Sequence, residues 1–368
     1  MTRYVLFGTL RWISLLEVVA GRTVACTPVT LPGFAVERAA AGDWPVLVPG
    51  AGTDALLTEP LDRATVARLD WYETAFDCRP ETIEIDGTDA RVYRTDDAGS
   101  GIAWDLEGWR AAHGGRTRRA AAEVMRAMDR LTPAEVAAMR GVIQARAHAM
   151  DLAARDRRTR TVGQEGRASD LRILATDYVY EGFHRVEEWS IDHPRFDGGR
   201  SGPIGRVVSN VTDAATVLPW DSVRDCVLVV EQIRMGALAK GDPYPWLLEP
   251  VAGLVDAGET PEASALRELT EEAGLVARPE DLHLVSRYYP SPGGLAQILY
   301  SYVARCDLPE DAAGLHGLEA EQEDIRTHIV PVDDLIEMVA SGEAANAPLV
   351  ISAQWIALRR AHARAHAH

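Results

Sequence analysis

Residues 253–275 read GLVDAGETPEASALRELTEEAGL, and this segment constrains the fold more than any other. Its second half has the composition of a helix that ends before a glycine. On that helix Glu268, Glu271 and Glu272 are related by three and four positions, so the three carboxylates share one face. Like charges at this spacing are destabilising unless cations neutralise them. The segment therefore predicts a cation site rather than an ordinary solvated helix surface.

The residue types around this face suit a hard divalent cation. Mg²⁺ and Mn²⁺ prefer carboxylate and carbonyl oxygens. Arg267 lies four residues before Glu271 and can hold it by a charge-assisted ion pair. Gly253 and Gly258 permit a tight turn that brings backbone carbonyls toward the metal.

The full spacing is Gly253, five residues, Glu259, seven residues, Arg267-Glu268-Leu269, one residue, Glu271-Glu272, one residue, Gly274-Leu275. This pattern resembles a complete Nudix box, with no departure at any fixed position. A chance match at one register has a probability of about 10⁻⁸ at ordinary residue frequencies. The resemblance implies metal-dependent hydrolysis of a nucleoside diphosphate linked to another group. It also implies that Glu268, Glu272 and the Ala252 carbonyl bind the metal and that Arg267 and Glu271 belong to the catalytic machinery.

Three further stretches resemble the ADP-ribose pyrophosphatase branch of that family, over roughly residues 166–368. They are EQIR at 231–234 with PWLLEPVAG at 245–253, YYPSPGG at 288–294, and GLHGLEAEQEDIRTHIV at 314–330. A proline about sixteen residues beyond the box marks the branch, and Pro290 and Pro292 lie in that region. The resemblance implies hydrolysis of ADP-ribose to AMP and ribose 5-phosphate.

The same resemblance implies roles for residues outside the box. The acidic loop 319–324 supplies Glu321 as the base that activates water and Glu323 as a metal ligand. The resemblance places Arg234 and Arg206 near phosphate or ribose, a role that fits arginine because it holds phosphate in a bidentate fork. It places Phe183 under the adenine, which fits an aromatic face that stacks on a purine. A core aromatic for Phe183 and a surface ion pair for Arg206 remain alternatives.

Two other functions remain open for this part of the chain. The first is the same chemistry on another nucleoside diphosphate sugar. The second is a sensor that binds ADP-ribose through a retained Nudix fold; the intact set of carboxylates argues against it, since a pure binder does not need all of them. Proteins of this branch are usually homodimers with exchanged N-terminal strands, so residues near 178–210 are expected to reach the partner's site.

The front of the chain carries a second resemblance. FGTLR at 7–11, LPGF at 31–34 and LDWYETAFDCRPETIEI at 69–85 resemble the γ-glutamylcyclotransferase-like fold, although Phe7 stands where that family usually has tyrosine. The resemblance implies that the backbone N–H groups of Gly8, Thr9 and Leu10 bind a carboxylate and that Glu73 carries the proton. A surface acid is the alternative for Glu73, and a ligand sensor or a dimerisation support is the alternative for the domain. The fusion also resembles proteins associated with tellurite resistance, a phenotype that gives no chemistry.

The whole chain is expected to be mixed α/β (α+β). We expect a cyclotransferase-like mixed β-barrel at 1–96, a helical connector of two helices at 97–165, and a Nudix α/β/α sandwich at 166–368. The net charge of −17 and the lack of a basic face argue against a nucleic-acid partner. No apolar run is long enough to span a membrane, and four widely spaced cysteines suit a reducing cytoplasm.

Overall fold

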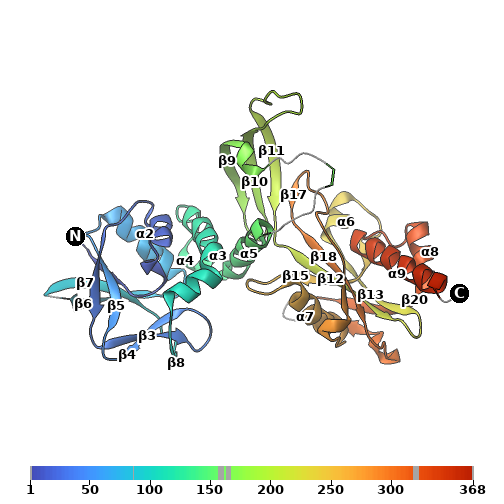
Figure 1. Ribbon diagram of the computed structural model, residues 1–368, viewed down its shortest axis with the longest axis horizontal. Helices are drawn as coiled ribbons and strands as arrows, with labels where there is room; N and C mark the ends of the chain where they lie inside the picture. The colour runs from blue at the N-terminus through green and yellow to red at the C-terminus, as the bar shows by residue number, and fades with distance from the viewer. Residues whose placement is uncertain (1, 86, 156–160, 163–166, 318–322, 367–368) are drawn as a thin grey trace. The chain divides into compact units, whose positions relative to one another are not determined.

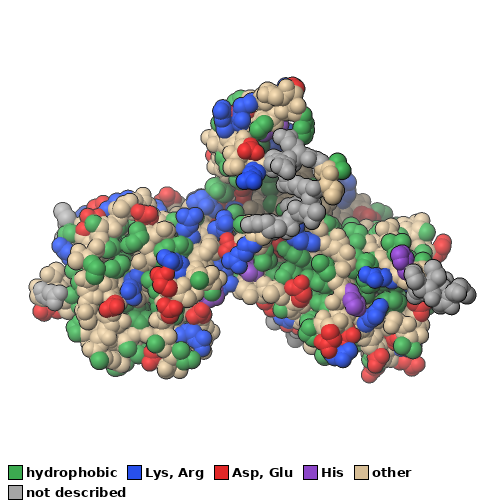
Figure 2. Space-filling model, viewed as in Figure 1, with side chains coloured by type: hydrophobic (Ala, Val, Ile, Leu, Met, Phe, Trp, Pro, Cys, Tyr) green, Lys and Arg blue, Asp and Glu red, His purple; other side chains and the backbone are tan. Residues whose placement is uncertain are grey.

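The computed structural model describes residues 2–85, 87–155, 161–162, 167–317 and 323–366, with the side chains of 363–366 excepted (Figure 1). The chain divides into two compact units, Met1–Asp156 and Arg157–His368, here called the front unit and the C-terminal unit. Acidic side chains are spread over the surface of both units, in keeping with the net charge of −17 (Figure 2). Within the described ranges, no helix has the length and apolar character that crossing a membrane requires.

The front unit contains two sheets. The larger has the order β2 (Cys26–Leu31), β5 (Thr53–Thr58), β1 (Tyr4–Leu6), β7 (Thr88–Arg94) and β6 (Arg79–Ile85); the smaller has the order β4 (Pro45–Pro49), β3 (Phe34–Ala39) and β8 (Gly99–Ala103). The expected mixed α/β architecture is confirmed, but the described strands do not close into the expected barrel. Pro28 and Pro80 lie in the two edge strands of the larger sheet, and a proline cannot donate the N–H that a further strand would need there.

In the described part of this unit, five α-helices contribute to a core shared with the larger sheet: α1 (Ile13–Ala20), α2 (Arg63–Thr74), α3 (Leu106–Arg126), α4 (Pro133–Ala138) and α5 (Arg140–Arg155). The segment 97–155 thus holds three helices where the sequence predicted two. Asp105 caps α3, and Thr132 forms a capping box with Glu135 that starts α4. The third helix arises because α4 ends at Ala138 and α5 begins at Arg140. The last three helices bury residues in the same core as Tyr4 and Leu15, while the three-part division of the chain at 96 and 165 stays a proposal.

The C-terminal unit is built on an eight-stranded sheet. Its order is β16 (Leu282–Tyr288), β18 (Leu299–Arg305), β12 (Ala214–Asp221), β13 (Cys226–Ile233), β20 (Ile325–Pro331) and β19 (Leu315–His316); β14 (Trp246–Glu249) pairs with β13, and β15 (Val251–Leu254) pairs with β12. Helix α7 (Pro261–Ala273) contacts β12 and β15.

Helices α8 (Val332–Ser341) and α9 (Ala347–His366) pack on the opposite face of the sheet from α7 (Figure 1). Their core includes Val227 and Val229 of β13. Because side chains alternate along a strand, Leu228 and Val230 face the α7 side. The expected α/β/α sandwich is confirmed.

A second, four-stranded sheet in this unit precedes the sandwich. Its strands are β9 (Arg172–Glu181), β10 (Arg185–Asp192), β11 (Ile204–Asn210) and the short β17 (Leu295–Ala296). The first three strands stand beyond the end of the eight-stranded sheet (Figure 1). Strand β17, which lies between β16 and β18 in the chain, pairs with β11 and so joins the two sheets.

Candidate active site

Helix α7 places the acidic segment on the sheet. Thr260 caps its first turn by accepting from the N–H of Ala263, and Pro261 occupies the first helical position, where a missing N–H costs nothing. Gly274 ends the helix in the left-handed region with φ of 63°. The helix predicted from the sequence is confirmed, with both ends set by local residue chemistry.

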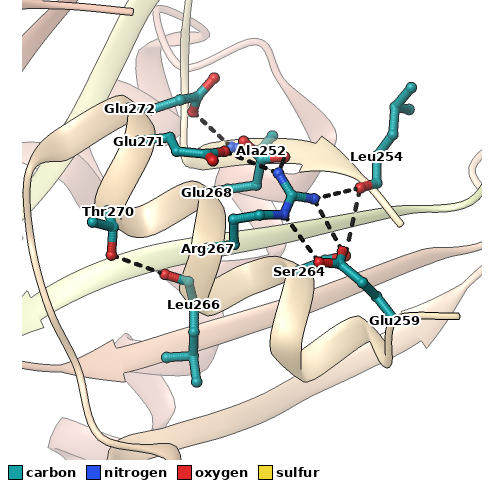
Figure 3. Close-up of polar contacts among 10 residues, drawn as sticks. All are labelled: Ala252, Leu254, Glu259, Ser264, Leu266, Arg267, Glu268, Thr270, Glu271 and Glu272. Carbon is teal, nitrogen blue, oxygen red and sulfur yellow. Dashed lines mark hydrogen bonds and ion pairs between the residues drawn. The ribbon is translucent and has the colours of Figure 1, made fainter. Parts of the chain in front are cut away.

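Arg267 joins the carboxylates of the segment (Figure 3). Its Nη1 donates to Glu268 Oε1 at 2.6 Å and to Glu271 Oε2 at 2.9 Å. Its Nη2 and Nε donate to the two oxygens of Glu259, each at 3.1 Å. Nη2 also donates to the Leu254 carbonyl at 3.1 Å. The expected ion pair with Glu271 is therefore one part of a five-bond hub that fixes the loop, the strand and the helix together.

Glu272 is the most enclosed carboxylate of the group, with 2% of its surface exposed. Its Oε2 accepts from the backbone N–H of Ala252 at 3.0 Å. Burial raises the pKa of Glu272 to about 8, and the nearby charges of Glu268 and Glu323 act in the same direction. Burial likewise raises the pKa of Glu268. The sheet and helix thus gather negative charge in a place where water does not screen it.

The two glycines before the helix do different work. Gly258 has φ of 98°, so it supplies the tight turn that was expected of it. Gly253 lies in β15 without a positive φ, and a Cβ there would stand 1.8 Å from Glu268 Oε1. The expectation that Gly253 serves a turn is wrong, because Gly253 lies within a strand. Its missing side chain instead leaves room for the Glu268 carboxylate.

In the front unit, Gly8, Thr9 and Leu10 form the start of a three-residue 3₁₀ turn, Thr9–Arg11. The N–H groups of Arg11 and Trp12 donate to the carbonyls of Gly8 and Thr9, each at 3.0 Å. A Cβ on Gly8 would stand 2.7 Å from Pro45 Cγ, so packing against β4 requires a glycine here whether or not a ligand approaches.

Glu73 lies near the end of α2, and burial raises the pKa of its carboxyl to about 7. The charge of Asp70, one turn earlier on the helix, acts in the same direction, while the Cys78 thiol opposes it. Asp70 is itself fixed, because its Oδ1 accepts from the hydroxyls of Tyr4 at 2.6 Å and Tyr93 at 2.7 Å. The sequence analysis missed this group, since the three residues come from separate segments of the chain.

Comparisons with known proteins match one family model to each of the two units. The model of the NUDIX domain matches residues 211–351, and the model described as gamma-glutamyl cyclotransferase, AIG2-like, matches residues 4–111. An ADP-ribose pyrophosphatase of Haemophilus influenzae is 37% identical over 194 residues, covering 52% of this chain and 88% of that protein. The chain belongs to the Nudix family.

Residues 157–368 are called the Nudix unit from here on. Other proteins similar to this unit are described as one of two enzymes. An ADP-ribose pyrophosphatase of Escherichia coli (strain K12) is 38% identical over 190 residues, with 52% of this chain and 89% of that protein covered. A GDP-mannose pyrophosphatase of Yersinia pestis (strain Pestoides F) is 30% identical over 185 residues, with 50% and 90% covered. A solved structure described as an ADP compounds hydrolase aligns with 52% of this chain and 96% of its own at 20% identity and a TM-score of 0.40.

The donor set of the Nudix unit fits a divalent cation. Buried, mutually repelling carboxylates with raised pKa values gain most from such an ion, and the glycine at 253 preserves the space around one of them. Among the described residues, no three acidic, histidine or cysteine side chains already converge as a metal-binding group. Glu268 accepts from Arg267 and Glu272 accepts from the Ala252 N–H. Glu323 is near enough to act on both carboxylates, and Glu321 lies outside the described residues.

Arg234 lies beside this group at the end of β13. Its Nε donates to Glu249 Oε2 at 2.5 Å, and Asn346 Nδ2 donates to the other oxygen of Glu249 at 2.7 Å. The Arg234 charge also lies close enough to Glu272 to oppose the rise in its pKa. Glu249 and Asn346 were missed in the sequence analysis, although Glu249 belongs to the quoted PWLLEPVAG stretch.

Arg206 lies in the four-stranded sheet and Phe183 in one of its turns, on different elements from the α7 carboxylates. Arg206, on β11, is paired with Trp189 of β10 and is exposed. Phe183 lies in the turn between β9 and β10, is 61% exposed, and stacks on His184 with ring centroids 5.5 Å apart. An exposed position removes a core role for Phe183, while its expected role under an adenine stays a prediction.

Proposed function

We propose that the Nudix unit hydrolyses the diphosphate of ADP-ribose to AMP and ribose 5-phosphate. The observation that carries the proposal is the intact carboxylate and arginine hub on α7, in a unit that aligns over 88–89% of two bacterial ADP-ribose pyrophosphatases. The lower identity to GDP-mannose pyrophosphatase, 30% against 37–38%, favours ADP-ribose over another nucleoside diphosphate sugar. A pure sensor would not need the complete set of buried acids.

Mg²⁺ or Mn²⁺ is the proposed cofactor, held by Glu268, Glu272, Glu323 and the Ala252 carbonyl. Bound there, a divalent ion neutralises diphosphate charge and lowers the pKa of a water molecule. Arg267 and Glu271 keep the acidic face in place, as their ion pair on α7 supports. Glu321 is proposed as the base that takes the proton from water.

Substrate contacts are proposed for Arg234, Arg206 and Phe183. Arg234 is supported by its place beside Glu272, where a guanidinium fork can also meet a phosphate oxygen. The exposed faces of Phe183 and Arg206 support stacking and phosphate contacts if this sheet reaches the site of a second copy.

A substrate panel tests the activity. ADP-ribose, GDP-mannose, NADH and diadenosine polyphosphates are compared with Mg²⁺ and with Mn²⁺, and products are identified by chromatography. We expect the highest kcat/KM for ADP-ribose, with AMP as one product. A higher value for GDP-mannose would reject the substrate and leave the chemistry intact, whereas no turnover of any compound with either metal would favour the sensor.

A homodimer formed through the Nudix unit is also proposed. Several apolar side chains of the β9–β11 strands are more than half exposed, namely Ile173, Leu174, Val179, Tyr180 and Val207. A second copy would bury them. Light scattering should give about twice the chain mass of 40.1 kDa. Val179→Asp should give the monomer, and Val223→Asp, at an even more exposed site in the turn between β12 and β13, should leave the dimer intact.

The second candidate function belongs to the front unit, as a γ-glutamyl cyclotransferase or a binder of small carboxylates. The favouring observation is Glu73, whose pKa of about 7 suits proton transfer near neutral pH. γ-Glutamyl-alanine is the test compound, with 5-oxoproline as the product to detect and Glu73→Gln as the negative control. Binding without 5-oxoproline would identify a ligand-binding unit instead.

The four free cysteines of the two units support a cytoplasmic location.

A further inference from the structure

Gln232 is a buried polar residue without an evident structural task. It is 8% exposed, and its Nε2 has no hydrogen-bond acceptor in the part of the chain that the structure describes. A buried amide donor left unpaired costs about 1–3 kcal/mol, so such groups call for a specific explanation. A ligand that supplies the missing acceptor is one.

Strand geometry sets the side of the sheet on which Gln232 lies. Val227 and Val229 of β13 belong to the core beneath α8 and α9. Alternation therefore puts Val230 and Gln232 on the opposite face, the face on which α7 packs against β12 and β15. Gln232 thus shares a face with the proposed active site.

The neighbours of Gln232 on the paired strand β14 do not supply an acceptor for its Nε2, which has none among the described residues. Its cross-strand partner on β14 is Leu247, whose side chain has no acceptor. Residues paired across antiparallel strands face the same side of a sheet, and Val230 is paired with Glu249. Glu249 is already engaged at both oxygens: Oε2 meets Nε and Nη2 of Arg234, and Oε1 accepts from Asn346.

The charges around Gln232 select the kind of acceptor. Arg234, two residues along the chain, reaches Glu249 and therefore lies on the same side of the sheet. Two donors, one cationic and one neutral, thus lie at the end of β13 beside buried carboxylates. An anionic oxygen of the substrate can accept hydrogen bonds from both side chains, whereas a hydrogen-bond donor on the substrate could not.

We infer that the Gln232 side-chain amide donates a hydrogen bond to a phosphate oxygen of the substrate, next to Arg234. Gln232 is then a binding residue of the Nudix site, and the inference rests on the proposed ADP-ribose hydrolysis. A neutral donor adds affinity for the diphosphate without neutralising the carboxylates that hold the metal.

Gln232→Leu tests the inference, because leucine fills similar volume and removes the donor. A hydrogen bond to a charged group corresponds to a change of about 10- to 100-fold, so we expect KM for ADP-ribose to rise by that factor with a smaller change in kcat. The melting temperature without ligand should stay the same or rise, since an unpaired buried donor has been removed. The rise in melting temperature caused by added AMP should shrink.

Glu231→Gln is the matched control. Glu231 is the next residue on β13, faces the α8 and α9 side, and pairs with His328 at 2.9 Å. This variant should keep wild-type KM and kcat.

Three outcomes are decisive. Wild-type KM in Gln232→Leu, with ADP-ribose turned over normally by the wild type, would overturn the inference and leave the function standing. A fall in melting temperature with unchanged KM would assign Gln232 a structural role instead. Failure of the wild-type protein to hydrolyse ADP-ribose would reject the proposed function, and the inference with it.

Discussion

The backbone N–H of Ala252 donates to Glu272 Oε2 across 3.0 Å, which ties the most buried carboxylate of α7 to strand β15. One neutral donor does not compensate for burial of a full negative charge. The pKa of about 8 reflects that imbalance, which burial produces and the charges of Glu268 and Glu323 increase. Two consequences follow, one for catalysis and one for stability.

Glu272→Gln should remove most turnover and leave the fold intact. The amide oxygen of glutamine can still accept from Ala252, but it carries no charge for a divalent ion. We expect kcat for ADP-ribose to fall at least about 100-fold at saturating Mg²⁺. Added Mg²⁺ should raise the melting temperature of the wild type and have little effect on the variant. Near-normal kcat would reject Glu272 as a metal ligand.

The same variant changes how stability depends on pH. The folded-state pKa of Glu272 is about 8 and its ordinary value is 4.5, so the folded state binds the proton more tightly. The free energy of unfolding of the metal-free protein should therefore fall as pH rises from about 4.5 to about 8. Glu272→Gln removes this contribution. Melting temperatures in EDTA should differ little near pH 4.5 and favour the variant at pH 8; a variant less stable at pH 8 contradicts the assignment.

Arg267→Lys keeps the charge and removes the planar fork. A lysine cannot meet Glu259, Glu268, Glu271 and the Leu254 carbonyl together, so the loop and helix lose their common anchor. We expect a loss of about 1–3 kcal/mol in the free energy of unfolding and a clear fall in kcat. Arg278→Lys, at an exposed pair with Asp281, should change stability by less than about 0.5 kcal/mol. Equal effects in urea melts would show that Arg267 is only a surface charge.

Local sequence signals specify the parts of the molecule that short-range chemistry determines. Thr260, Pro261 and Gly274 set the ends of α7, and Thr132 starts α4, all within a few residues of the structure they specify. The charged face of α7 followed from helical spacing alone. The other site residues were predicted from the spacing of the motif. Glu259 and Arg267, for example, are eight positions apart in the sequence, and their side chains bond directly in the structure.

Contacts between distant segments were not predictable from one sequence. The partner of Arg234 is Glu249, fifteen positions away, and Asn346 reaches the same carboxylate from the start of α9. Asp70 accepts hydrogen bonds from the hydroxyls of both Tyr4 and Tyr93 because their strands, β1 and β7, are neighbours in the sheet. The unpaired amide of Gln232 has no signal in composition, since only the folded sheet shows which face it occupies.

Gly253→Ala should disturb the metal site through space rather than backbone strain. The new Cβ would stand 1.8 Å from Glu268 Oε1, so the carboxylate must leave its place. We expect the Mg²⁺ concentration for half-maximal activity to rise and kcat to fall at least about 10-fold. Gly236→Ala in α6 (Met235–Lys240), where a Cβ meets nothing within 4 Å, is the control and should be neutral. Unchanged Mg²⁺ dependence in Gly253→Ala would show that Glu268 is not needed in this position.

The last prediction concerns Glu73 and the front unit. Its pKa of about 7 exceeds the ordinary value of 4.5, chiefly because of burial and then because of the Asp70 charge, against the Cys78 thiol. Protonation is therefore tighter in the folded state, and the stability of the front unit should fall as pH rises from about 4.5 to about 7. Glu73→Gln should remove that fall and be relatively more stable at pH 8.

Calorimetry of the full chain at several pH values gives the comparison. The difference between wild type and variant isolates Glu73 from Glu272, whose contribution covers an overlapping pH range. Glu84→Gln, at an exposed carboxylate on β6, is the matched control and should leave the profile unchanged. Identical profiles for Glu73→Gln and the wild type would mean that water reaches the Glu73 carboxyl freely. A freely solvated carboxyl lacks the raised pKa that proton transfer in a cyclotransferase pocket needs, so that result would also remove the physical support for the second candidate function.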